Sequence, residues 1–138
     1  MQILVADDDP VYRTLLKSLL GELHFEALLA EDGAQAWGVL QRPEAPEIAI
    51  LDLWMPRMDG GQVCQMVRQK GLFEKASLPY ILLMTSNTSR EDLLRILVAG
   101  ADDYLLKPFE PLDLKIRLRT AVRIVNLQMD RQSAMGTS

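Results

Sequence analysis

Two groups of carboxylates stand directly after apolar runs, in positions that suit metal binding and phosphate chemistry. Asp52 follows the apolar residues 48–51 and precedes a loop containing proline and glycine. Asp7 and Asp8 follow the apolar residues 3–6 in the same way. In an open parallel sheet, functional groups collect just beyond the carboxyl ends of the strands. We therefore expect the two acidic groups to meet at one edge of one sheet.

Two later apolar runs end in side chains that complement such a cluster. Thr85 follows residues 80–84, and Lys107 follows residues 103–106. Clustered carboxylates repel one another, so at neutral pH they need a proton or a bound cation. Hard oxygen ligands without a nearby histidine or thiolate favour Mg²⁺, which commonly takes one or two carboxylates. The pattern predicts a Mg²⁺ site beside a hydroxyl and an ammonium group.

Length and composition predict one soluble domain. The 138 residues fit a single core, and 49% hydrophobic with 25% charged residues is close to the average for soluble proteins. A net charge of -4 argues against direct binding of nucleic acid. We find no leader sequence and no apolar run near the roughly 20 residues that span a bilayer. We expect a cytoplasmic protein that does not contact the membrane.

Strand and helix patterns alternate five times along the chain. Strands are predicted at residues 2–6, 25–30, 47–51, 80–84 and 103–106. Helices are predicted at residues 10–20, 34–40, 62–70, 89–100 and from 111 onward. Parallel neighbours need right-handed helical crossovers, so this alternation predicts an α/β domain with a five-stranded, doubly wound parallel sheet.

The expected helix ends depend on caps and glycines. Asp9 is expected to cap the first helix and Ser89 the fourth, whereas Gly21 and Gly71 are expected to end the first and third. Residues 133–138 are small and polar and are expected to fray. The last helix carries a long apolar stripe made of Leu114, Leu118, Ala121, Val122 and Val125. Part of this stripe is expected to pack on the sheet, which leaves the remainder for another contact.

Taken together, these motifs resemble the receiver domain of bacterial two-component response regulators. The resemblance spans about residues 2–128 and rests on Asp7-Asp8, Asp52 in Leu-Asp-Leu-x-Met-Pro-x-Met-Asp-Gly, Thr85-Ser86, the run Ala-Gly-Ala-Asp-Asp-Tyr ending at Tyr104, and Lys107-Pro108-Phe109. It implies a flavodoxin-like strand order 2-1-3-4-5 with five helices. It also implies a receiver domain at residues 1–128, with residues 129–138 starting a connection to an output domain.

The resemblance assigns roles to the acidic residues. Asp52 would be the phosphoacceptor, attacking phosphorus in line to form an aspartyl phosphate. Asp8 and Asp52 would bind Mg²⁺ through their carboxylates. Asp7 would assist through water, and the main-chain carbonyl of Trp54 would complete the protein ligands.

The resemblance also implies how the signal leaves the site. Thr85 and Lys107 would hold the phosphoryl oxygens, and the Lys107-Pro108 peptide bond would be cis. Movement of Thr85 would open space for rotation of Tyr104, the expected switch. The face formed by the fourth helix, fifth strand and fifth helix would then control an output domain or partner.

The implied function is a phosphorylation-dependent switch. A sensor histidine kinase or a phosphotransfer protein would supply its phosphoryl group. The domain would catalyse its own phosphotransfer and dephosphorylation without being an enzyme for another substrate. A homodimer could form through the output face, where basic residues of the last helix would meet the acidic Glu91, Asp92, Asp102 and Asp103. A solvated charged face on a monomer is the alternative.

Three other functions fit parts of the pattern. A flavodoxin-type nucleotide binder would need glycine-rich phosphate loops, which are missing. A haloacid-dehalogenase phosphatase would need a second aspartate two residues after the nucleophile, where Trp54 stands. A stand-alone or degenerate receiver that acts by protein contact remains the third alternative, although none of the principal site positions is replaced.

Overall fold

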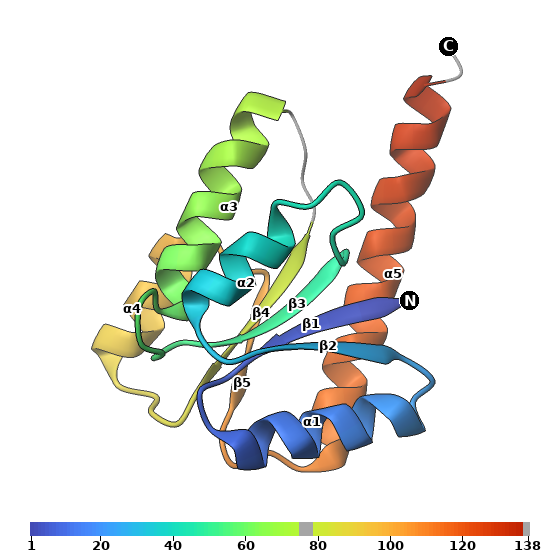
Figure 1. Ribbon diagram of the computed structural model, residues 1–138. Helices are drawn as coiled ribbons and strands as arrows, with labels where there is room; N and C mark the ends of the chain where they lie inside the picture. The colour runs from blue at the N-terminus through green and yellow to red at the C-terminus, as the bar shows by residue number, and fades with distance from the viewer. Residues whose placement is uncertain (75–78, 137–138) are drawn as a thin grey trace.

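The computed structural model describes residues 1–74 and 79–136, and in this part of the chain strands and helices alternate (Figure 1). The strands are β1 Gln2–Ala6, β2 Glu26–Ala30, β3 Ile48–Asp52, β4 Tyr80–Thr85 and β5 Asp103–Leu106. The helices are α1 Pro10–Glu22, α2 Gly33–Leu40, α3 Gly60–Glu74, α4 Arg90–Ala99 and α5 Pro111–Gly136. All strand pairs are parallel, in the order β2-β1-β3-β4-β5, which confirms the predicted topology.

Each face of the sheet is covered by its own set of helices. Helices α2, α3 and α4 cover one face and α1 and α5 the other, as Figure 1 shows. Successive side chains of a strand point to opposite faces, so Leu4 packs under the first set and Val5 under the second. The interior positions of the central strands are therefore apolar on both faces, as expected for a sheet buried on both sides.

Side-chain caps fix where the helices begin. The Asp9 side chain accepts from Val11 N at 2.9 Å, with Pro10 as the first helical residue of α1. Ser89 caps α4 by accepting from Asp92 N at 3.2 Å. Both predicted caps are confirmed. These caps matter for the site because α1 and α4 begin immediately after β1 and β4.

The prediction that Gly21 and Gly71 end helices is wrong, because both lie inside α1 and α3. Helix α1 ends instead at Glu22, and His24, two residues later, takes the left-handed conformation with φ 67. The amide of Phe25 then donates to Leu20 O at 2.9 Å and that of His24 to Gly21 O at 3.0 Å. This is the Schellman pattern, and it satisfies the last carbonyls without a glycine.

Two further boundaries differ from the prediction. Asp52 and Thr85 are the last residues of β3 and β4 rather than the first residues of the following loops. Helix α5 continues to Gly136 and so includes residues 133–136, which were expected to fray, while 137–138 lie outside the described residues. The apolar stripe of α5 is buried within the domain at Leu114, Leu118, Ala121 and Val125. It therefore leaves little for a second contact.

Gly33 tests how tightly α2 packs on the loop that follows β3. A Cβ at Gly33 would overlap the carbonyl oxygen of Met58, whereas one at Gly38 in the same helix would meet nothing. We expect Gly33→Ala to lower the free energy of unfolding by about 2–3 kcal/mol. Gly38→Ala should raise it by about 0.5–1 kcal/mol, because alanine is the better helix former. Urea denaturation measures both, and equal stabilities would contradict this packing.

Candidate functional site

Asp7, Asp8 and Asp52 meet at the carboxyl edge of the sheet, as predicted. Strands β1 and β3 are neighbours, and their register pairs Ala6 with Leu51, so the next residues emerge side by side. One oxygen from each carboxylate lies within 4.8 Å of the others. Asp7 is completely buried, Asp52 is half-buried and Asp8 is exposed. The cluster is therefore open on one side only.

Lys107 enters this cluster from the end of β5. Its Nζ lies 2.7 Å from Asp7 Oδ2 and 3.3 Å from Asp52 Oδ1. The Lys107 amide donates to Thr85 O at 2.8 Å, and the Lys107-Pro108 bond is cis, as expected from the resemblance. The structure thus brings together the ammonium and the carboxylates that sequence analysis singled out.

The charges of the site are incompletely balanced. Burial and the charge of Asp7 raise the pKa of Asp52 to about 6, although Lys107 opposes this shift. For Lys107, burial favours the neutral form, but the hydrogen bond to Asp7 and the charge of Asp52 outweigh it, so its pKa is raised. One lysine therefore does not cancel the mutual repulsion of three carboxylates.

The donor set fits a hard divalent cation. Three carboxylates converge, and the described residues add no histidine or thiolate to the group. Burial, together with the charge of Asp7, raises the pKa of Asp52 although Lys107 is close, so the ionised carboxylate is poorly stabilised by the groups around it. The acidic triad could therefore bind a metal, and Mg²⁺ suits an oxygen-only set that leaves room for water. A contribution from the Trp54 main-chain carbonyl stays a prediction.

Thr85 ends the strand next to β3, and Tyr104 lies on the edge strand β5; both face partners other than the acidic cluster. The Thr85 hydroxyl is buried, 3.0 Å from Asn87 O and 3.2 Å from Asp92 Oδ2, so it is directed toward α4. Tyr104 is partly buried against the apolar cluster beneath α2, α3 and α4. Its carbonyl accepts from Arg117 Nε at 2.7 Å. The rotation of Tyr104 stays a prediction.

Sequence analysis missed Tyr12 as part of the site. Its ring lies 4.0 Å from Lys107 Nζ, a cation–π contact, and packs at 6.2 Å from the Phe109 ring. Tyr12 is in the first turn of α1, which begins directly after the β1 carboxylates, and that position was the available signal. The ring of Tyr12 therefore helps to hold the Lys107 ammonium at the site, and Phe109 packs against that ring.

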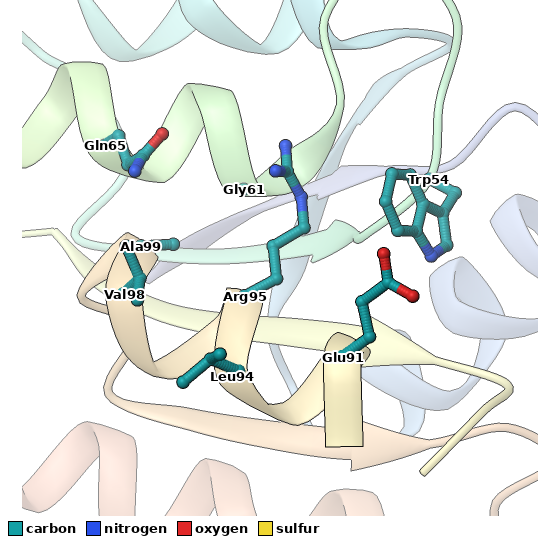
Figure 2. A pocket seen from close by; sticks show the side chains of 8 residues that line it. All are labelled: Trp54, Gly61, Gln65, Glu91, Leu94, Arg95, Val98 and Ala99. Atoms are coloured by element: carbon teal, nitrogen blue, oxygen red, sulfur yellow. The ribbon is translucent and has the colours of Figure 1, made fainter. Parts of the chain in front are cut away.

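Trp54 turns its side chain toward α4. Its ring is 51% exposed, its Nε1 donates to Asp92 Oδ2 at 3.4 Å, and the Arg95 guanidinium carbon lies 5.1 Å from the ring centroid. Figure 2 shows the ring at one end of a groove between α3 and α4, near the carboxylate of Glu91. Arg95 is in turn paired with Asp59 across the two helices. The buried position of Asp92 and its bond to Trp54 were not expected, because the sequence analysis placed Asp92 on an accessible charged face.

A parallel sheet with three carboxylates and a lysine at its carboxyl edge defines a signalling domain with a site typical of a phosphoacceptor. The family model described as "Response regulator receiver domain" matches residues 3–119. The chain belongs to the response regulator receiver domain family. The described residues contain this domain and no catalytic output domain.

Curated relatives support the same assignment. The chain is 37% identical over 137 residues to the response regulator MprA of Mycobacterium avium (strain 104), covering 99% of this chain and 58% of that protein. It is 36% identical over 125 residues to the probable transcriptional regulator ycf27 of Porphyridium aerugineum, covering 91% of this chain and 49% of that protein. The chain thus spans about half the length of these relatives.

Solved structures match nearly the whole fold. A putative response regulator from Chloroflexus aurantiacus J-10-fl is 30% identical with a TM-score of 0.79, covering 88% of this chain and 97% of that chain. The receiver domain of the sensor histidine kinase PA1611 from Pseudomonas aeruginosa PAO1 is 27% identical with a TM-score of 0.73, covering 94% and 97%. That structure has a magnesium ion coordinated in its active site cleft.

The raised pKa of Asp52 makes a prediction about stability and pH. Folding raises this pKa from 3.8 to about 6, so the ionised carboxylate destabilises the fold as pH rises through this range. In EDTA at pH 7.5, Asp52→Asn should be more stable than wild type by about 1–3 kcal/mol. The gain should shrink below pH 6 and vanish near pH 4.

Urea denaturation at several pH values measures this difference. Asp130→Asn, which removes an exposed carboxylate from α5, is the matched control and should show no such pH-dependent gain. A gain for Asp52→Asn that is the same at pH 7.5 and pH 4.5 would contradict the electrostatic explanation.

Proposed function

We propose that this receiver domain is a switch in which Asp52 accepts a phosphoryl group from a sensor histidine kinase or a phosphotransfer protein. The observation that supports this most directly is the position of Lys107, whose ammonium lies 2.7 Å from Asp7 and 3.3 Å from Asp52. A cation held beside a desolvated carboxylate is placed to neutralise an arriving phosphoryl group.

The proposed transfer forms one bond to phosphorus and breaks another. An Asp52 oxygen attacks in line while the bond from phosphorus to the donor's imidazole nitrogen breaks, and its electron pair leaves with that histidine. Asp8 and Asp52 would hold Mg²⁺, which when bound neutralises charge on the phosphoryl oxygens. Asp7 through water and the main-chain carbonyl of Trp54 are the further proposed ligands.

Lys107 and Thr85 would hold the transferred group. The Lys107 ammonium can leave Asp52 for a phosphoryl oxygen with little movement, because Tyr12 and Asp7 already fix its position. The Thr85 hydroxyl would have to turn away from Asp92 to donate to the same group. This turn would vacate the space into which Tyr104 is proposed to rotate.

Phosphorylation of Asp52 is the central prediction. Incubation with acetyl phosphate and Mg²⁺ should add the mass of one phosphoryl group to the wild-type protein. The Asp52→Asn variant should gain none, and Lys107→Ala should be labelled at least about tenfold more slowly, because the attacking charge is no longer neutralised. Intact-mass spectrometry follows both. Equal labelling of the Asp52→Asn variant would refute the assignment of the phosphoacceptor.

We propose that the signal leaves through the face formed by α4, β5 and α5. Exposed large apolar side chains on these three elements include Leu97, Leu106 and Ile116, whereas Leu94 and Val98 line the groove toward α3 and Leu112 lines a groove beside α1. The acidic residues expected to pair two copies are mostly engaged within the chain. Asp92 is buried, Asp102 pairs with Arg68 at 2.6 Å, and Asp103 lies 3.8 Å from Arg117. A partner or second copy would therefore be held mainly by apolar contacts.

A dimer through this face is the form that can be tested directly. Beryllofluoride with Mg²⁺ mimics the phosphoryl group, and it should shift wild type toward dimer in sedimentation. Leu97→Lys should prevent the shift, because it places a charge in the apolar patch. Val11→Lys on α1, an equally exposed apolar position off this face, should not prevent it. A wild type that stays monomeric in both states at high concentration would exclude the dimer.

A receiver that acts by contact without phosphorylation is less well supported, because Asp52, Asp7 and Lys107 are all present and assembled. None of the helices in residues 1–74 and 79–136 has the length and apolar character needed to cross a membrane. The cytoplasmic location stays a prediction. It suits a domain that receives its phosphoryl group from a histidine kinase.

A further inference from the structure

The Thr85 hydroxyl is committed to α4 in this structure. It lies 3.0 Å from Asn87 O and 3.2 Å from Asp92 Oδ2, and its oxygen accepts from Asn87 N at 3.2 Å. A hydroxyl carries a single proton, so a bond from Thr85 to a phosphoryl oxygen requires that both acceptors give it up. The charged acceptor, Asp92, is the stronger competitor.

Asp92 holds the loop after β3 as well as Thr85. The same oxygen, Asp92 Oδ2, accepts from Trp54 Nε1 at 3.4 Å. Trp54 follows Asp52 by two residues, and its ring rests beside Arg95 on the next turn of α4. One carboxylate oxygen on α4 is therefore bonded both to the loop that follows Asp52 and to Thr85 at the end of β4.

Asp92 has an unusual environment for an acidic residue. It is 7% exposed, although its neighbours Leu94 and Leu97 on the same short helix are 55% and 75% exposed. No lysine, arginine or histidine in the described part of the chain lies within ion-pair distance of its carboxylate. Its charge is stabilised by neutral donors and by its place in the first turn of α4. Loss of a donor would leave a buried charge poorly satisfied.

We propose that Asp92 is a positioning residue that keeps the domain in its unphosphorylated state by holding the Thr85 hydroxyl and the start of α4 together. This proposal rests on the proposed function and names its regulation. A phosphoryl group on Asp52 competes with Asp92 for the same hydroxyl proton. Once Thr85 turns, the Asp92 carboxylate needs water, so the first turn of α4 moves outward and displaces Leu94 and Leu97.

The proposal has a quantitative consequence for ligand binding. A ligand that needs the turned Thr85 binds with an apparent affinity reduced by the fraction of molecules in which Asp92 still holds it. Removal of the carboxylate raises the competent fraction. Mg²⁺ alone does not need the Thr85 hydroxyl, so its affinity stays the same.

The test compares Mg²⁺ and beryllofluoride binding in the full chain by calorimetric titration. Asp92→Ala should bind beryllofluoride, at saturating Mg²⁺, about three- to tenfold more tightly than wild type. Asp92→Asn keeps a hydrogen-bond acceptor without the charge, so its affinity for beryllofluoride should lie between those of wild type and Asp92→Ala. Glu91→Gln removes one charge from the adjacent, exposed position and should behave as wild type. Affinity for Mg²⁺ alone should be unchanged in all variants.

The outcomes separate this proposal from the function on which it rests. A wild type that binds no beryllofluoride and gains no phosphoryl mass would overturn both. A wild type that binds, with Asp92 variants that bind equally or more weakly, would overturn the role of Asp92 alone, because a purely structural residue can only weaken binding. If Asp92→Ala does not fold, Asp92→Asn, which matches the native side chain in size, decides the result.

Discussion

The repulsion among Asp7, Asp8 and Asp52 is the constraint on which the site depends. Carboxylates this close together need a proton or an accompanying cation, above all where they are buried. The structure supplies one cation, Lys107, and confines it between Asp7 and the ring of Tyr12. Burial and the charge of Asp7 together raise the pKa of Asp52 to about 6. Three carboxylates at one partly buried site fit a divalent cation and would need cationic help in phosphoryl transfer.

The parallel sheet is what brings the charged and polar residues of the site so close together. Four strand ends bring their polar residues to one edge because the registers of β1, β3, β4 and β5 align. The apolar residues before them are buried on both faces, and that burial outweighs the cost of the charged edge. Caps such as Asp9 and Ser89 then start helices at this edge without leaving backbone amides unpaired.

Helix α4 packs mainly against α3 and makes few contacts with the strands of the sheet. Its outer side is apolar and exposed, while Asp92 and Arg95 anchor it through polar contacts to Thr85, Trp54 and Asp59. Such contacts have discrete alternatives, so a charge change at Asp52 can reach the helix through them. Helix α4 is therefore part of the face through which the signal is proposed to leave.

The sequence by itself determined the five strands of the sheet and the acidic residues at its edge, because burial on both faces leaves an apolar run before each carboxylate, and the strand order followed from the resemblance of its motifs to a known family. It did not determine the ends of α1 and α3, where Schellman bonding at His24 and continued helix at Gly71 overrode the glycine signal. Only the tertiary structure decided the roles of Tyr12 and Asp92. Asp92 does not differ in type or local pattern from an ordinary surface residue of a helix, and the one signal for Tyr12 was its place shortly after the carboxylates of β1. Tyr12 contacts Lys107, which is far away in the sequence, and Asp92 contacts Thr85, which belongs to a different element. The local sequence pattern does not predict such pairs.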